Sequence, residues 1–371
     1  MSKNKFERMT AKQIGSMVGC CQQAVSSVLS GRGNSKVSRE KREKILEIAR
    51  NFNYQPNFSA LNLAGRATKA IGIIPENSIF CAEIQLALST GLRALGYHTV
   101  FSPLVTHYEE KMTIDTLLGY GVDGIISLNK KGDFTHEKIK IPTVLVSYKN
   151  YDVDIDWADG FYQAAEHLIR HKHKRIAFLT DVWAYNTRLL EKGYRAAMKK
   201  AGLPCLDSWK IELLWNRDFE KQLLELLEKE KITAFLCTTD MIACRLMSWL
   251  KSHGIRIPEE VAVIGNLGCT FGETMSPSLT SLIYPLHEIC RIAAEMIVEK
   301  IQNKSCQRIQ KPVLVKSSLY AEHSCGCPEK EIKIIWWEGL PLSYERLHQY
   351  QRLQPPPDFL HNDPLNPQQE M

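Results

Sequence analysis

The sequence predicts a small all-α helix-turn-helix domain followed by an α/β body of two doubly wound lobes with parallel sheets. Residues 10–53 contain three short amphipathic helix patterns, and a glycine turn separates the first two. Residues 70–302 alternate short apolar strands with helices, which is the order of βαβ units. With 371 residues, the chain is long enough for one large bilobed body and a small module beside it.

The first helix is predicted to begin after Thr10, whose hydroxyl can accept a hydrogen bond from a backbone N–H of the first turn. Ile14, Met17 and Val18 follow at a spacing that places them on one helical face. Gly19 permits the left-handed turn that ends this helix. The pattern is typical of the first helix of a helix-turn-helix.

The second helix is predicted to begin at Gln22 and to stop at Gly31. Three small apolar residues are expected on its buried face: Ala24, Val25 and Val28. Its outward side chains are small and polar: Gln22, Gln23, Ser26 and Ser27. Such a face suits hydrogen bonding to base edges and phosphates in a major groove.

A third helix is predicted over Arg39–Asn51, with Ser38 as its N-cap. Pro56 closes this region, because proline lacks an N–H and restricts the residue before it. Asn57 can cap one more short segment, residues 58–64. We therefore assign residues 1–53 to the helix-turn-helix domain and residues 54–69 to a hinge helix and linker.

The body is predicted from residue 70 to residue 327. Its expected strands are 70–74, 98–101, 122–128, 143–147, 175–180, 233–238 and 261–265. Its expected helices are 83–95, 111–118, 159–170, 190–201, 219–230, 241–253 and 287–302. Doubly wound sheets bind ligands beyond the carboxyl ends of their strands, and two such lobes can close on a ligand by a hinge motion. No glycine-rich phosphate motif follows the first strand, which argues against a dinucleotide enzyme.

Charge is unevenly distributed between these parts. Residues 1–69 contain 13 Lys and Arg against 4 Asp and Glu, which gives +9. The whole chain is +6, so the remaining residues carry about −3. A basic head on a mildly acidic body indicates a nucleic-acid partner for the head alone, and a solvated basic face is the alternative.

The order of these motifs resembles the lactose-repressor (LacI) family of bacterial transcription regulators. In the head, the resemblance rests on the helix-turn-helix and on residues 37–38, 42–46, 54–57 and 63–65. In the body, it rests on residues 121–126, 165–169, 174–178, 193–198, 257–265 and 276–282. The resemblance covers residues 9 to about 325. It implies a sequence-specific repressor with a periplasmic-binding-protein-like body, whose operator affinity is controlled by a small effector between the lobes.

The resemblance also implies how the head binds double-stranded operator DNA. The second helix reads base edges in the major groove, where glutamine is matched to adenine, and hinge leucines wedge apart a base step in the minor groove. The implied DNA-contacting residues are Thr10, Gln22, Gln23, Ser26, Ser27, Ser30, Lys36, Arg39, Asn57, Leu63 and Ala64. A solvated helix start remains the alternative for Gln22 and Gln23, and packing against the body remains the alternative for Leu63.

The expected effector pocket departs from the family pattern. An arginine usually stands three residues before the glycine-aromatic pair of one helix, but Leu190 occupies that position before Gly193 and Tyr194. The usual aspartate after strand 261–265 is also replaced, by Asn266-Leu267-Gly268. A charged pair of this kind fixes adjacent sugar hydroxyls, so its loss argues against the usual sugar geometry.

We therefore expect a different ligand, related to a sugar. The candidate contacts are Phe80, Asp156, Trp157, Trp183, Tyr185, Arg188, Trp215, Thr239 and Asp240. Trp157 and Trp183 could instead be packed core residues. A site that has lost its effector, and control by a protein partner, are the remaining alternatives for regulation. A solute-binding protein that is not a regulator is disfavoured by the basic head.

Several other classes are excluded by the composition. No apolar run could span a membrane, and the N-terminus lacks a signal-peptide core. Eleven scattered cysteines are typical of reduced thiols in a cytoplasm. No grouping of Ser, His and Asp indicates catalysis, so we expect no enzyme and no cofactor. Residues 323–327 (HSCGC) lack a second ligand pair at zinc-finger spacing, and residues 171–174 read as a solvated loop, so no metal is expected.

The C-terminal extension, residues 328–371, departs from the family. Residues 332–337 (IKIIWW) could form an added strand, and residues 354–371 read as a disordered tail. No leucine heptad marks a tetramer, so we expect a homodimer that binds a pseudo-palindromic operator. The expected location is the bacterial cytoplasm, at the nucleoid when the protein is bound to DNA.

Overall fold

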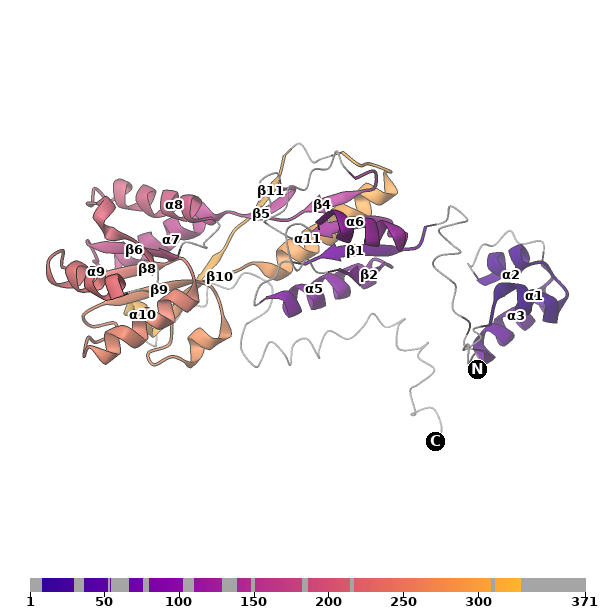
Figure 1. Cartoon of the computed structure of the whole chain (residues 1–371), viewed down its shortest axis with the longest axis horizontal. Helices are drawn as coiled ribbons and strands as arrows, with labels where there is room; N and C mark the ends of the chain where they lie inside the picture. The colour runs from indigo at the N-terminus through magenta and orange to yellow at the C-terminus, as the bar shows by residue number, and fades with distance from the viewer. Residues whose placement is uncertain are drawn as a thin grey trace, which may run out of the picture.

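A computed structural model of the chain describes residues 9–29, 37–52, 54, 67–75, 80–102, 110–128, 139–147, 151–181, 186–213, 217–307 and 311–327. Figure 1 shows a three-helix module and a body of two α/β lobes. The expected hinge helix at 58–64, the added strand at 332–337 and the tail at 354–371 lie outside the described residues. Within the described ranges, no helix is long and apolar enough to cross a membrane.

The head consists of α1 (Ala11–Val18), α2 (Gln22–Leu29) and α3 (Arg39–Asn51). Gly19 takes the left-handed conformation, with φ at 66°, and so permits the tight turn between α1 and α2. The three helices enclose a small hydrophobic core of their own, in which Ile14, Val25 and Ile45 are fully buried. The predicted helix-turn-helix and the predicted third helix are therefore confirmed.

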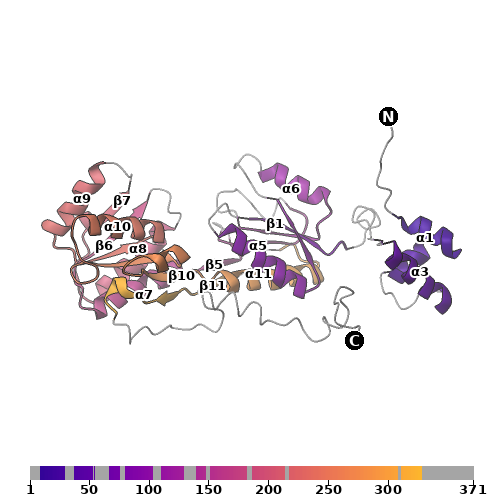
Figure 2. The same ribbon diagram turned by 90° about the horizontal axis from the view of Figure 1, so that it is seen from below.

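The first lobe has a parallel sheet in the order β2 (His98–Phe101), β1 (Ala70–Ile74), β3 (Gly124–Ser127) and β4 (Thr143–Leu145). Side chains alternate along β1: Ile71 and Ile73 join the cluster that contains α5, whereas Ala70 and Ile74 join the cluster around Leu117 of α6. Helices α5 (Cys81–Ala94) and α11 (Leu286–Gln302) thus lie on one face, and α6 (Glu110–Gly119) lies on the other (Figure 2).

The second lobe has six strands in the order β12 (Ser318–Tyr320), β10 (Thr280–Ile283), β9 (Ala262–Leu267), β8 (Ala234–Cys237), β6 (Ile176–Asp181) and β7 (Lys210–Leu213). All neighbours are parallel except β12, which runs antiparallel to β10. Four helices complete the lobe: α7 (Trp157–Arg170), α8 (Thr187–Lys200), α9 (Arg217–Glu228) and α10 (Asp240–Ser252). Helices α7 and α8 lie above the sheet in Figure 1, and α10 lies below it.

The chain passes between the lobes three times. The passages follow β5 (Val153–Ile155), β10 and β11 (Val313–Val315). Strands β5 and β11 pair in parallel with each other and lie where the lobes meet (Figure 1). Because the last helix, α11, returns to pack against α5, the first lobe is built from two distant parts of the chain. Ligand-facing side chains are therefore expected near these passages.

The α/β class and the alternation of strands and helices predicted from the sequence are confirmed. The predicted helices correspond in order to α5 through α11, and the seven predicted strands correspond to β1–β4, β6, β8 and β9. Five short strands were missed: β5, β7, β10, β11 and β12. Each of these strands has only three or four residues, which is too short for a recognisable alternation of apolar and polar residues.

Candidate functional site

The polar end of α2 forms the candidate nucleic-acid interface. Gln22 and Gln23 stand in the first turn of this helix, and both are exposed. Val25 and Val28 are buried in the head core, so packing fixes which side of α2 faces outward. Ser26 and Ser27 are half-buried. This arrangement leaves the two amide side chains accessible to a groove, which is what base readout requires.

Thr10 has a structural role at the start of α1. Its hydroxyl accepts a hydrogen bond from the backbone N–H of Gln13 at 3.2 Å, and the Gln13 side chain accepts from the Thr10 N–H at 2.8 Å. This reciprocal pair is a capping box, which satisfies two otherwise unpaired donors. Thr10 is nevertheless exposed, so its contact with DNA stays a prediction.

Arg39 lies in the first turn of α3 and points into solvent. Its guanidinium donates to Glu43 at 3.0 Å, and both side chains are largely exposed. An exposed pair of this kind is weak, so the guanidinium can exchange its partner for a phosphate. The other implied DNA contacts, Ser30, Lys36, Asn57, Leu63 and Ala64, lie outside the described residues and stay predictions.

Aromatic side chains from three elements meet where the chain passes between the lobes. Phe80 precedes α5 in the first lobe, and its ring centroid lies 5.5 Å from that of Tyr284. The Trp157 ring, at the start of α7 in the second lobe, stacks on Tyr284 at 6.3 Å. Two of the predicted ligand residues are thus joined by Tyr284, which the sequence analysis missed. Its position directly after β10, at a passage between lobes, is the feature that could have identified it.

Trp157 is mostly a packed residue. Its side chain is buried, and its indole N–H donates to Asp154 Oδ1 at 3.2 Å. The same carboxylate oxygen accepts from the hydroxyl of Ser147 at 2.7 Å. These contacts fix the indole in one orientation and favour the alternative in which Trp157 is a core residue, although its ring still faces Tyr284.

Asp156 and Thr239 cap two helices of the second lobe. Asp156 Oδ1 accepts from the backbone N–H of Asp159 at 3.0 Å, at the start of α7. Thr239 Oγ1 accepts from the N–H of Ile242 at 3.3 Å, at the start of α10. Both caps lie at the N-terminal ends of helices, where the backbone dipole favours a polar or anionic ligand. Their contact with a ligand stays a prediction.

Asp240 is an internal hydrogen-bonding centre. It is completely buried, and its carboxylate accepts from the backbone N–H of Cys269 and from the hydroxyl of Ser281. Burial raises the pKa of Asp240 to about 6, although these hydrogen bonds lower it. The carboxylate ties α10 to β10 and to the turn after β9. A ligand would have to displace these partners. Asp240 therefore has a structural role, and its contact with an effector stays a prediction.

The segment Asn266-Leu267-Gly268, which stands where the family has its aspartate, begins with a residue that has a structural role. Asn266, at the end of β9, is buried, and its side-chain amide donates to the carbonyl of Thr238 at 3.0 Å. This hydrogen bond joins the ends of β9 and β8. The segment that replaces the usual aspartate thus contributes a hydrogen bond from an uncharged, buried side chain at the carboxyl edge of the sheet.

Arg188 lies on the outer surface of α8. It is exposed and lines a shallow surface depression of about 460 Å³ together with Glu191, Lys192 and Arg195. Leu190, which occupies the family's arginine position, is buried in the core. Trp183, Tyr185 and Trp215 lie outside the described residues. The aromatic group of Phe80, Tyr284 and Trp157 is thus the part of the predicted ligand site that the described residues bring together.

Comparisons with known proteins agree with this architecture. Residues 165–325 match the model of the periplasmic binding protein-like domain. The chain is 30% identical over 298 residues to catabolite control protein A of Priestia megaterium, covering 76% of this chain and 88% of that protein. It is 27% identical over 319 residues to the transcriptional repressor PurR of Vibrio parahaemolyticus, covering 81% and 94%.

Solved structures show the same fold. The lac repressor dimer bound to operator and the anti-inducer ONPF superposes with a TM-score of 0.73 at 21% identity, over 86% of this chain and 99% of that one. A complex of the regulator CelR with cellobiose gives a TM-score of 0.58 at 24% identity, over 85% and 100%. These relatives are transcription regulators and not enzymes, which agrees with the expectation that this protein is not an enzyme. The chain belongs to the lactose-repressor (LacI) family of transcription regulators.

Proposed function

We propose that this regulator is a repressor whose affinity for its operator is set by a small molecule bound between the two lobes. The observation that carries the proposal is the junction of Phe80, Tyr284 and Trp157, where aromatic rings from both lobes and a passage between them meet. A ligand seated against these rings would contact both lobes at once, so it would favour one lobe arrangement over another. That differential contact is what effector control needs.

The chemistry of this junction favours a ligand with a flat or weakly polar face. Aromatic rings supply stacking surface, and the helix cap at Asp156, directly before Trp157, supplies an acceptor. The buried carboxylate of Asp240 is already engaged. A sugar ring or a nucleobase fits this combination better than a ligand with many charges. CelR is named in a complex with cellobiose, which supports a sugar-related effector.

Control by a protein partner is the second candidate. It is favoured by the loss of two charged family positions: the buried Leu190 replaces the arginine, and the segment Asn266-Leu267-Gly268 replaces the aspartate. A site without those groups would bind sugars more weakly, and regulation would then depend on contacts elsewhere on the body.

We also infer a homodimer that assembles through the body. Large apolar side chains are exposed on both lobes, among them Leu86 on α5, at 56%, and Met241 on α10, at 54%. Figures 1 and 2 place α5 and α10 on the same side. A two-fold dimer would match a pseudo-palindromic operator, with the protein acting in the cytoplasm. Sedimentation of the full chain and of Met241→Glu tests this, because the charge should shift the dimer toward monomer.

The function is tested first by selecting bound sequences from a random duplex pool with the full chain at a stated salt concentration. Enrichment of a pseudo-palindrome supports a dimeric operator-binding protein. Binding without sequence preference would contradict it. The enriched duplex then serves as the probe for effectors.

Effectors are tested by adding a panel of sugars and nucleobases to that complex and following both operator release and tryptophan fluorescence. Phe80→Ala should weaken the response to an active compound, whereas Phe271→Ala, at an exposed phenylalanine, should leave it unchanged. If no compound acts on the wild-type protein, protein-partner control becomes the preferred reading.

A further inference from the structure

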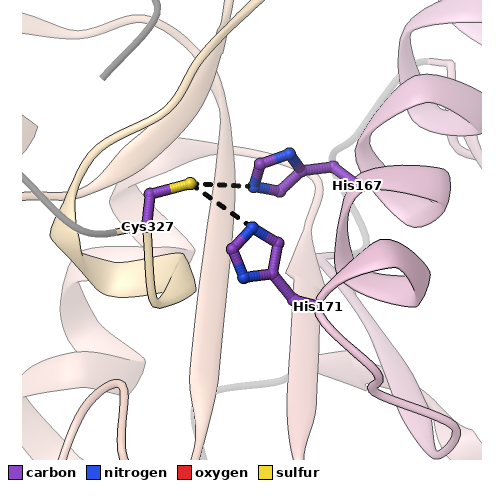
Figure 3. Close-up of side chains that lie close together, drawn as sticks. All are labelled: His167, His171 and Cys327. Carbon is purple, nitrogen blue, oxygen red and sulfur yellow. Dashed lines mark hydrogen bonds between the residues drawn. The ribbon is translucent and has the colours of Figure 1, made fainter. Parts of the chain in front are cut away.

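Two histidines at the C-terminal end of α7, His167 in its last turn and His171 as its C-cap, lie against the turn that ends the described chain. His167 and His171 are one helical turn apart, so they share a face of α7. Cys327 Sγ lies 3.4 Å from His171 Nε2 and 3.6 Å from His167 Nε2 (Figure 3). Cys325 Sγ lies 3.2 Å from the same nitrogen of His167. The two histidine nitrogens and the Cys327 sulfur therefore converge from segments 156 to 160 residues apart, and the Cys325 sulfur lies against one of these nitrogens.

The two cysteines are held on a rigid support. They flank Gly326, whose φ of 87° permits the tight turn between them. Ser324, just before, donates to the carbonyl of Val263 at 2.6 Å and accepts from the N–H of Thr280 at 2.8 Å. This turn is thereby fixed to β9 and β10. The two thiols consequently face α7 without a rearrangement of the backbone.

The spacing of these atoms matches a tetrahedral metal site. With Zn–S bonds of about 2.3 Å and Zn–N bonds of about 2.0 Å, a tetrahedral ion separates its nitrogen and sulfur ligands by about 3.5 Å. The three sulfur–nitrogen distances here are 3.2, 3.4 and 3.6 Å. The ligand atoms of His167, His171 and Cys327 all lie within 4.8 Å of one another. One ion could therefore reach these groups with small side-chain movements.

The surroundings favour a bound cation as well. Cys325 is fully buried, and Cys327 and His167 are nearly so, at 8% and 9% exposure. Imidazole in its neutral form is a common metal ligand. Thiols are weak hydrogen-bonding groups, so an ion would replace these contacts with stronger ones.

We propose that His167, His171 and Cys327 form a structural site for a zinc-type divalent cation, and that Cys325 becomes the fourth ligand when its thiol leaves the Glu322 carbonyl, to which it donates at 3.2 Å. On binding, each thiol releases one proton to solvent, and the two thiolates with the two neutral imidazoles complete a tetrahedral set. The site joins the end of α7 to the segment that leads into residues 328–371. Trp157 starts the same helix ten residues before His167, which is about 15 Å away along the helix axis. The cation therefore stabilises the second lobe without touching the proposed effector site.

The contacts of Cys327 bear on two expectations from the sequence. Residues 171–174 were expected to be a solvated loop, but His171 is only partly exposed and faces Cys327. Residues 323–327 were expected to lack a second ligand pair at zinc-finger spacing, and this still holds, because His167 and His171 stand far earlier in the chain.

The test uses the full chain, purified under reducing conditions without a metal-affinity step. Elemental analysis of the protein should find one zinc per chain. Titration of the chelated protein with Co²⁺ should give the visible bands of a tetrahedral ion and the thiolate-to-cobalt band of a cysteine site. Chelation should lower the melting temperature, and zinc should restore it.

Matched variants locate the ion. Cys327→Ser and His171→Gln should each lose the bound zinc and weaken or abolish the thiolate-to-cobalt band. Cys306→Ser and His253→Gln change exposed residues of the same kinds outside the site, and both should keep one zinc. Absence of zinc together with absence of cobalt bands in the wild-type protein would overturn the proposal. Zinc retained in both site variants, or a Cys325–Cys327 disulfide in the reduced preparation, would do so too.

Discussion

Lys300 Nζ, near the end of α11, lies 3.4 Å from Asp152 Oδ1 just before β5, and both side chains are buried. The ammonium also donates to the carbonyl of Thr143 at 2.7 Å, and Asp152 accepts from the N–H of Leu145 at 2.8 Å. Burial lowers the pKa of Lys300, although Asp152 favours its charged form. The pair thus fastens the returning helix to β4 and β5, beside a passage between the lobes.

Replacing Lys300 with methionine should therefore strongly destabilise the body. The substitution leaves Asp152 buried without its cation, and losing one partner of a buried pair costs about 3–5 kcal/mol. Urea denaturation measures the loss. Arg291→Met is the control on the same helix, because Arg291 pairs with Glu288 and Glu295 at the surface. That variant should lose about 0–1 kcal/mol. Equal losses in the two variants would contradict a special role for the buried pair.

The contact between α7 and α8 depends on Gly193. A Cβ at this position would overlap the carbonyl oxygen of Ala158, which belongs to the backbone of α7 and cannot turn away. Gly193→Ala should therefore push the helices apart and lower the free energy of unfolding by about 1–3 kcal/mol or more. Thermal and urea unfolding of the variant measure this loss.

Gly119→Ala is the matched control for that substitution. Gly119 ends α6, and a Cβ there would meet nothing within 4 Å. Alanine has the higher helix propensity, so this variant should stay within about 1 kcal/mol of the wild type or gain stability. If both alanine variants change the free energy of unfolding equally, Gly193 is not needed for the close approach of the α7 and α8 backbones.

Local signals in the sequence predicted much of the fold. The bounds of α3, β1 and β2 agree with those expected, because a serine cap, a proline stop and compact apolar runs mark them. The missed strands lack such marks. Strand β11, for example, has a half-buried, an exposed and a buried residue, and it exists because β5 pairs with it. Pairing between distant segments is not visible in either segment alone.

In the candidate sites, too, local sequence patterns predicted some residues correctly, whereas contacts between distant segments could not be predicted. The outward position of Gln22 and Gln23 follows from helical periodicity, and the structure places both as expected. Tyr284 joins Phe80 and Trp157 only through the arrangement of the lobes. Asp240 looked available in the sequence because it follows an apolar strand, but its partners Cys269 and Ser281 come from later parts of the chain.

The buried carboxylate of Asp240 should make stability depend on pH. Burial raises its pKa to about 6, from 3.8 in the unfolded chain, so the folded state binds this proton more tightly. The resulting stabilisation is fully present below pH 3.8 and is lost as the pH rises through about 6. The difference between the two pKa values corresponds to about 3 kcal/mol.

Asp240→Asn isolates this contribution, since the amide cannot titrate. The variant should be less stable at every pH because its NH₂ group cannot accept a hydrogen bond from Cys269 or Ser281. The stability of the wild type relative to the variant should fall by about 2.4 kcal/mol between pH 4 and pH 7 in urea titrations. Asp115→Asn changes an exposed carboxylate and serves as the control. A pH-independent difference for Asp240→Asn would mean that the carboxyl titrates normally.

The exposed glutamines of α2 should determine which operator is bound. Gln22→Ala and Gln23→Ala each remove an amide that can pair with a base edge, so each should weaken binding to the selected operator by about 1–3 kcal/mol. Binding to unrelated duplex should hardly change, because phosphate contacts dominate it. Fluorescence anisotropy with both duplexes at several salt concentrations measures the two affinities together.

Salt dependence separates base readout from charge contacts. The glutamine variants should keep the wild-type slope of log affinity against log salt, whereas Arg39→Ala should reduce its magnitude by about 0.9 if its guanidinium contacts one phosphate. Ser16→Ala is the control, because Ser16 is exposed on α1 and its hydroxyl donates to the carbonyl of Lys12 in the same helix. Operator affinity unchanged in both glutamine variants would show that α2 does not read bases through its first turn, and the outward face at Ser26 and Ser27 would then be the next place to look.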